Sequence, residues 1–324
     1  MKKWTLFLFL ILTIASCKRD PLKVNLSNVS MEPQILRFDT AFFETPLDRF
    51  SQRLPEIQNQ FPEFFMAGQT DSSWAEVRRD SMLNSLYKKV AEKYPNISAL
   101  RPDIISVLKH RAYYFPSVHP DVRVITYISG LDWEYAIINA DSVFFVGIDL
   151  FLGEDTVYSN FPYYIAKRLS PEFLGPKMAV QAARPYVNRD PRDGSFLNQM
   201  LHYGRTLYIA EAFLPEVESH RILEYTAEEM QWCLDNETDV WTFFVEEELI
   251  FKNDKSLHDR FLAEAPFSKF YKKIDRESPG RIGQWIGWRI VHSYMEAHPE
   301  TTIQELAQWT DARAFFQQAQ YKPF

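Results

Sequence analysis

The order of hydrophobic and polar positions predicts a short strand followed by a series of helices in the first third of the chain. Residues 34–38 have the pattern of a short strand. Thr45 followed by Pro46 is typical of a helix start, and apolar residues then recur at spacings of three and four. We expect helices from residue 45 onward, over 73–94 and over 98–113.

The periodicity changes in the middle of the chain, where short β-rich runs are separated by Gly130 and the polar stretch 139–141. Their spacing fits a small antiparallel meander with strands over 122–128, 135–138 and 142–146. After Gly153 the chain has the pattern of helices joined by turns that contain proline. The predicted fold class is therefore α+β, predominantly helical, with one small sheet.

The N-terminus has the features of an export signal. Lys2 and Lys3 precede an apolar run over 4–14. Eleven helical residues span about 16 Å, against about 30 Å of hydrocarbon core, so the run is too short for a stable membrane span. It ends in an aliphatic residue, two small residues and Cys17, an order that resembles the bacterial lipobox. The alternative is an ordinary secretory signal with an incidental cysteine.

If Cys17 carries a diacylglycerol, it is the first residue of the mature protein. We then expect a signal peptide over 1–16, a lipidated tether over 17–33 and a single globular domain over 34–324. Two or more acyl chains anchor a protein stably, whereas one is marginal. Only Cys233 remains beside Cys17 in the mature chain, so we expect no internal disulfide and a buried, apolar Cys233.

Composition and charge exclude several classes of protein. The 324 residues include 26 Phe, 16 Tyr and 8 Trp but only 10 Gly. This excludes a disordered chain or a collagen-like repeat and argues against a glycine-rich dinucleotide fold. With 36 basic and 43 acidic residues, a nucleic-acid partner is not expected.

The histidine positions exclude the common helical zinc motifs. None of the seven histidines has a glutamate neighbour, and no two are four residues apart, so H-E-x-x-H and H-x-x-E-H are both absent. One cysteine in the mature body does not make a thiolate zinc site. We predict no metal and no cofactor. The acidic runs 228–229 and 246–248 are expected on solvated faces, because adjacent helical residues point in different directions.

The segment 279–295 carries three glycines, Gly280, Gly283 and Gly287, at positions i, i+3 and i+7 of a helix. Each interior glycine costs up to about 1 kcal/mol relative to alanine, so we expect another backbone to approach closely along this stripe. The neighbouring face, which belongs either to the core or to a groove for a partner, carries Trp285, Trp288 and His292.

Several further segments share their order with one protein family. Besides the lipobox and 279–295, they are Arg37-Phe38-Asp39, 148–153, 202–208, Tyr225-Thr226, Trp232-Cys233, Asn236-Glu237 with Trp241, Arg260-Phe261 and 265–270. Over nearly the whole chain this order resembles the gliding-motility lipoprotein B (GldB) family of Bacteroidetes. The resemblance implies a membrane-anchored envelope lipoprotein that supports gliding, a process linked in that group to the type IX secretion machinery.

The C-terminal helix is also similar to one in zincin-like metallopeptidases. That likeness implies a zincin-like fold with a degenerate site, in which the helix around 200–208 takes the place of the zinc-binding helix. His202 stands there without a partner histidine, and a half-buried structural role is the alternative for it. Glu211 or Glu237 would be the remnant of a third ligand, but a lone carboxylate does not hold zinc.

Three hypotheses about function follow. The first is a catalytically inactive scaffold lipoprotein that binds other gliding-motility or envelope proteins. The second is an envelope hydrolase, acting on peptidoglycan, polysaccharide or peptide, whose His202, Glu211 and Glu237 would meet within about 6 Å. The third is a carrier with an aromatic pocket larger than roughly 300 Å³. Lys18 and Arg19, directly after the cysteine, favour a protein that faces the periplasm.

Overall fold

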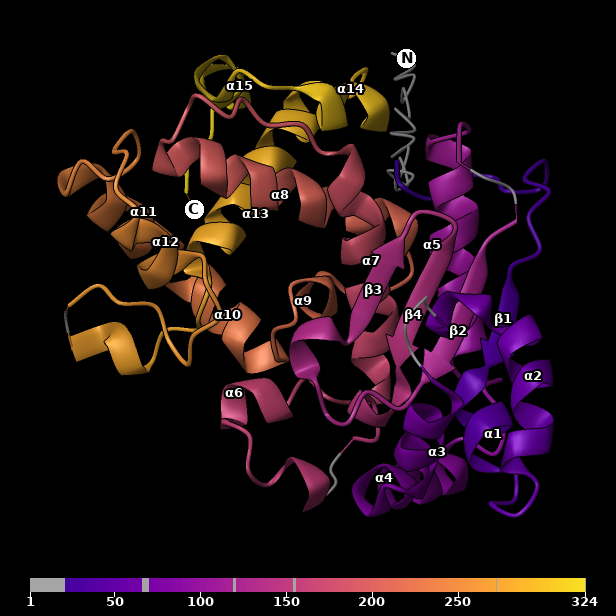
Figure 1. Ribbon diagram of the computed structural model, residues 1–324. Helices are drawn as coiled ribbons and strands as arrows, with labels where there is room; N and C mark the ends of the chain where they lie inside the picture. Colours follow the sequence, from indigo (N-terminus) through magenta and orange to yellow (C-terminus); the bar gives the residue numbers. More distant parts are fainter. Residues whose placement is uncertain (1–20, 66–69, 119–120, 154–155, 272, 324) are drawn as a thin grey trace, which may run out of the picture.

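The computed structural model describes residues 21–65, 70–118, 121–153, 156–271 and 273–323 (Figure 1). The expected signal peptide and Cys17 lie outside the described residues. Within these ranges the chain is mostly helical and has one sheet of four strands, which confirms the α+β prediction. None of the helices in these ranges combines the length and the apolar character that crossing a bilayer requires.

The sheet is mixed, so the predicted antiparallel meander is wrong. Its strands, in spatial order, are β1 (Gln34–Arg37), β2 (Arg123–Tyr127), β4 (Val143–Gly147) and β3 (Ile137–Ala140). β2 runs parallel to both β1 and β4, and only β3 and β4 pair antiparallel, through a turn at Asp141 and Ser142. Val124 and Ile125 of β2 are fully buried and belong to two different hydrophobic clusters, so β2 needs cover on both faces and lies inside the sheet.

One face of the sheet is covered by four helices that share an aromatic cluster. They are α1 (Phe38–Phe43), α2 (Phe50–Gln60), α3 (Asp71–Arg79) and α4 (Ser81–Lys93). The single helix predicted over 73–94 is divided at Asp80, whose carboxylate accepts the Leu83 backbone N–H at 2.8 Å and caps α4. Arg78, at the end of α3, donates to the carbonyls of Phe43 and Thr45, which fixes α3 beside α1.

The other face of the sheet packs on the larger helical core. This core is built on α5 (Arg101–Tyr114), α7 (Leu174–Ala183), α8 (Phe196–Phe213) and α13 (Ile282–Ala297). The helix predicted over 98–113 corresponds to α5, which carries Pro102 in its first turn. α8 contacts α5, α7 and α13, and most of its residues are buried.

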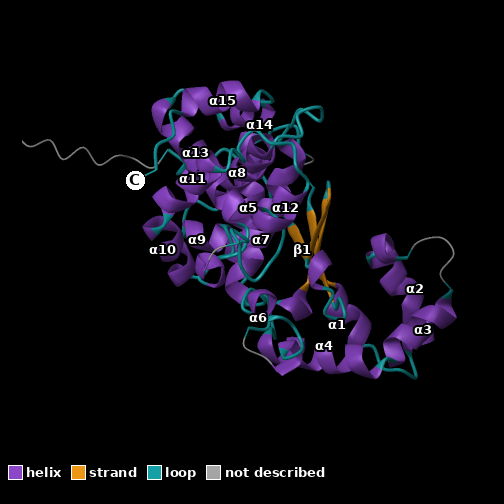
Figure 2. Cartoon of the chain, turned by 90° about the vertical axis from the view of Figure 1, so that its left-hand side faces the viewer, coloured by secondary structure: helices purple, strands orange, loops and turns teal. Residues whose placement is uncertain are grey.

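Shorter helices surround α8 and α13. They are α6 (Tyr163–Ala166), α9 (Ser219–Ile222), α10 (Ala227–Asp235), α11 (Glu237–Glu246), α12 (Ser256–Phe261), α14 (Ile303–Gln308) and α15 (Ala312–Ala319). Figures 1 and 2 both show α14 and α15 at one end of the molecule and α1 to α4 at the other. Cys233 on α10 is a free, fully buried thiol, as expected.

Candidate functional site

Two glycines allow α8 and α13 to approach closely. A methyl group on Gly287 would lie 2.0 Å from the Met200 carbonyl oxygen, and one on Gly204 would lie 2.3 Å from the Gly287 carbonyl. The three glycines of segment 279–295 do not share one neighbour. Gly283 faces the Phe261 carbonyl, and Gly280, which precedes α13, faces the Ala265 carbonyl. The close crossing brings the side chains of α8 against those of α13.

Glu211 of α8 is held by two side chains of α13. Its Oε2 accepts hydrogen bonds from Trp288 Nε1 at 2.9 Å and from His292 Nε2 at 2.7 Å. Glu211 is buried, and so are Trp285 and Trp288, which places both tryptophans in the core. His292 stacks edge-on against Trp288 and remains partly exposed. These contacts give Glu211 a packing role between the two helices.

Glu237, at the start of α11, is paired with Arg289 of α13. Arg289 donates from Nε and Nη2 to the two carboxylate oxygens at 2.8 and 3.1 Å, and the Tyr321 hydroxyl donates to Oε1 at 2.7 Å. Burial, followed by the hydrogen bond to Glu237, raises the pKa of Tyr321, so this hydroxyl keeps its proton. The bidentate pair joins α11, α13 and the C-terminal segment.

His202 lies away from both carboxylates. It stands nine residues before Glu211 on α8, which is about 13 Å along the axis and on the opposite side of the helix. Burial, followed by the positive charges of Arg205, Arg189 and Arg184, lowers the pKa of His202 to about 4. Its Nδ1 is buried without a hydrogen-bond partner in the described residues. The structure therefore does not bring His202 together with Glu211.

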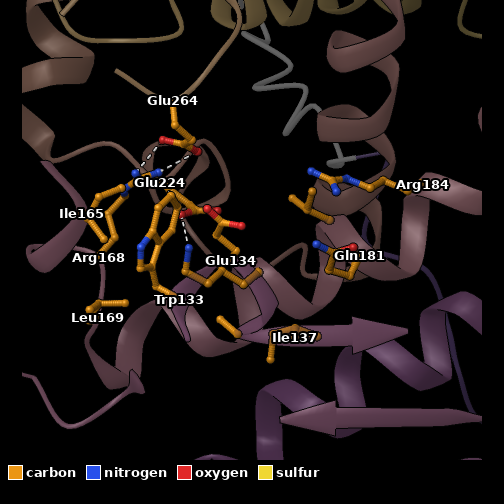
Figure 3. Close-up of a pocket in the computed structure, with 13 residues that line it drawn as sticks. Trp133, Glu134, Ile137, Ile165, Arg168, Leu169, Gln181, Arg184, Glu224 and Glu264 are labelled. Atoms are coloured by element: carbon orange, nitrogen blue, oxygen red, sulfur yellow. Dashed lines mark hydrogen bonds and ion pairs between the residues drawn. The ribbon is translucent and has the colours of Figure 1, made fainter. Parts of the chain in front are cut away.

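A polar recess of about 270 Å³ opens between α6, α7 and the turn at Trp133 (Figure 3). One side of the recess, called here the charged wall, is formed by Arg168, Glu224 and Glu264. Arg168, which follows α6, donates to both oxygens of Glu264 at 3.1 and 2.6 Å. The same guanidinium lies 3.3 Å from Glu224, which also pairs with Lys177 of α7. Figure 3 shows Arg184 on the other side of the recess.

The charges of this recess are mostly paired with one another. Burial alone would raise the pKa of Glu224, but Lys177, Arg168 and Arg281 outweigh it and lower the pKa to about 2. Glu224 is therefore ionised at neutral pH. Arg281 also donates to the Leu223 carbonyl at 2.9 Å, which connects the start of α13 to the network. The network fastens α6, α7, the turn after α9 and the start of α13 to one another.

The model of the family described as gliding motility protein GldB matches residues 19–323, which is nearly the whole sequence. The chain belongs to the GldB family. Searches of the curated proteins and of the solved structures found no match. The likeness of this GldB-family chain to zincin-like metallopeptidases therefore stays a prediction from sequence.

A second, smaller cavity of about 70 Å³ adjoins the recess in this GldB-family fold and is lined by His202 and Thr206 of α8. Arg184, Glu224 and Glu264 line both cavities, so His202 lies on the far side of the charged wall. Among the residues described, no group of three or more His, Cys, Asp or Glu side chains is placed to hold a metal ion.

Sequence reasoning missed the charged wall of the GldB-family fold. Arg168, Glu224 and Glu264 are spread over almost a hundred residues and belong to no recognised motif. The available signal is local: Glu224 lies between Leu223 and Tyr225, and a charge among apolar residues requires a partner. The identity of that partner depends on the fold.

Proposed function

We propose that this chain is an envelope lipoprotein, anchored through a lipid on Cys17, that supports gliding motility as a catalytically inactive partner-binding protein. Its membership of the GldB family supports the link to motility. The export signal and the lipobox-like order before Cys17 support the anchor. The proposed partners are other gliding-motility or envelope proteins, including components of the linked type IX secretion machinery, and not nucleic acids.

The inactive role rests on one observation, which is that Glu211 and Glu237 are each engaged by side chains of α13. Glu211 accepts from Trp288 and His292, and Glu237 accepts from Arg289 and a tyrosine hydroxyl. A general acid or base needs an open approach to its substrate, and these hydrogen bonds direct both carboxylates into the packing between helices. His202 is too far from Glu211 to act with it.

The hydrolase hypothesis required His202, Glu211 and Glu237 in one cleft. In the structure Glu211 and Glu237 belong to two separate networks, and His202 lines another cavity on the opposite side of α8 from Glu211. This arrangement favours a structural role for each of the three. We also propose a periplasm-facing orientation, supported by Lys18 and Arg19 directly after the cysteine.

The decisive test of the inactive role uses the purified mature domain. Metal content is measured by mass spectrometry, and cleavage is assayed on a peptide library and on peptidoglycan, with and without chelator. We expect zinc below stoichiometry and no turnover on either substrate. Stoichiometric zinc with chelator-sensitive peptide cleavage would overturn the proposal, and so would peptidoglycan hydrolysis that Glu211→Gln abolishes without loss of folding.

The motility role is tested in the source bacterium. A gene deletion is complemented with the wild-type chain or with Cys17→Ser, and surface spreading and export of secreted proteins are measured. We expect the wild-type chain to restore the spreading and export that the deletion removes. The unanchored variant should restore neither, even when it is equally abundant. Crosslinking in the intact envelope should then join the wild-type chain to other envelope proteins.

A further inference from the structure

The first described residues of the chain are fixed to the body. Leu22 and Val24 pack against the large core, and the Leu22 carbonyl accepts a hydrogen bond from the Tyr114 hydroxyl at 3.3 Å. Lys23 pairs with Glu216 at 2.8 Å, and Met31 is buried. Part of the segment expected as a tether over 17–33 therefore belongs to the folded body. The position of Pro21 is set by the core and not by the bilayer.

The remaining link between body and anchor is short. Three residues lie between Cys17 and Pro21, and the four Cα–Cα steps that join the two span at most about 14 Å when extended. The acyl chains on Cys17 would lie in the hydrocarbon core, which is about 30 Å thick, and the Cys17 backbone would lie at its surface. Pro21 would then lie within about 14 Å of that surface. A lipid on Cys17 thus holds Pro21, and the surface around it, close to the headgroups. The body does not have the freedom that a long tether would allow.

We propose that the end of the body around Pro21 lies on the bilayer and that membrane phospholipid is the partner of this surface. This inference rests on the proposed lipid anchor. The surface, called here the anchor face, is formed by the docked segment, the end of α5, the loop before α14 and the start of α14. The residues that line its groove of about 390 Å³ include Pro21, Leu22, Tyr113, Tyr114, Pro299 and Ile303.

The chemistry of the anchor face suits a headgroup region. Tyrosines are enriched where membrane meets water, because their rings are apolar and their hydroxyls are polar. Tyr113 is 44% exposed, lines the groove and stacks edge-on against Tyr114. Lys18 and Arg19 lie within the short link, where each attracts anionic lipid by about 1 kcal/mol.

The anchor face fixes the orientation of the whole body. Figures 1 and 2 show α14 at the end of the molecule opposite α1 to α4. With the anchor face on the bilayer, α1 to α4 point away from it. Leu47, Val77 and Met82 are large apolar side chains exposed in that region, so they are presented to the aqueous space and not to lipid.

The test places a fluorescent label at either end of the lipidated protein. Tyr113→Cys marks the anchor face and Met82→Cys, 53% exposed, is the matched distal control. The native Cys233 is fully buried and Cys17 is occupied by lipid, so each label is unique. Each protein is reconstituted in vesicles of phosphatidylethanolamine and phosphatidylglycerol that carry a headgroup quencher. A third protein carries a Gly/Ser insert of 20 residues after Asp20, with a mean span of about 25 Å.

We expect quenching several-fold stronger at position 113 than at position 82, and a several-fold reduction at 113 with the insert. Equal quenching at both positions would overturn the anchor face, and strong quenching at 113 that persists with the insert would overturn the role of the short link in positioning it. A change in fluorescence at position 113 with free fatty acid, but not with vesicles, would assign the groove to a carried lipid. That result would also overturn the anchor face. Failure of the lipidated protein to float with vesicles would overturn the anchor itself, which is a separate result.

Discussion

The Gly204 and Gly287 backbones are in direct contact where α8 crosses α13. A Cβ atom on Gly204 would lie 2.3 Å from the carbonyl carbon and oxygen of Gly287, a distance that no side-chain adjustment relieves. The contact sets the separation of the two helices that carry Glu211, Trp288 and Arg289 between them. Much of the larger core depends on this crossing.

Gly204→Ala should therefore destabilise the fold by about 3 kcal/mol or more, because both backbones must move apart. Urea unfolding followed by circular dichroism measures the loss. The control is Glu296→Ala, an exposed position on α13, which should change the unfolding free energy by less than about 0.5 kcal/mol. Equal stability of the Gly204→Ala variant and the wild type would show that the helices are not in contact as described.

Two arginines that line the same recess should differ in their importance for stability. Arg168 is buried and is paired with Glu224, which is mostly buried, and with Glu264, whose side chain is 38% exposed. Arg168→Ala removes a partner from both carboxylates and should cost about 3 kcal/mol. Arg184 is exposed, and in the described part of the chain it makes no ion pair, so Arg184→Ala should cost less than about 0.5 kcal/mol. The reverse order in thermal denaturation would contradict the charged wall.

His202 should make stability depend on pH. Its pKa falls from the ordinary 6.5 to about 4 in the folded protein, so between these values the unfolded chain binds more protons. The contribution is complete above pH 6.5 and is lost as the pH falls toward 4. With partial solvent exposure taken into account, it amounts to about 1–2 kcal/mol. The measurement compares the slope of stability against pH for the wild type and His202→Gln. Identical slopes would contradict a partly buried imidazole that stays neutral.

Glu237→Gln separates a structural role from a catalytic one. The amide cannot accept the two Arg289 hydrogen bonds as a carboxylate does, so the variant should lose about 2 kcal/mol of unfolding free energy. Glu246→Gln, an exposed change on the same helix, is the control and should be neutral. A fully stable Glu237→Gln protein that fails to complement the gene deletion would favour a chemical role for this carboxylate.

Local patterns predicted the elements better than their arrangement. The β-rich run at 122–128 and the helical spacing at 98–113 correspond to β2 and α5, because the period of apolar residues reports burial along one element. The parallel pairing of residues 34–37 with 123–126 has no local signal, and neither does the Arg168–Glu264 pair. The predicted helical stripe includes Gly280, but Arg281 adopts a left-handed conformation at φ 62°, so α13 begins after both residues.

Lipid labelling shows directly whether the body is attached to the envelope through Cys17. Cells that express the wild-type chain or Cys17→Ser are grown with labelled palmitate, fractionated, and examined for label and location. We expect a labelled, membrane-bound wild type and an unlabelled, soluble variant with an unchanged melting temperature. An unlabelled wild type, or a Cys17→Ser protein that stays in the membrane fraction, would contradict it.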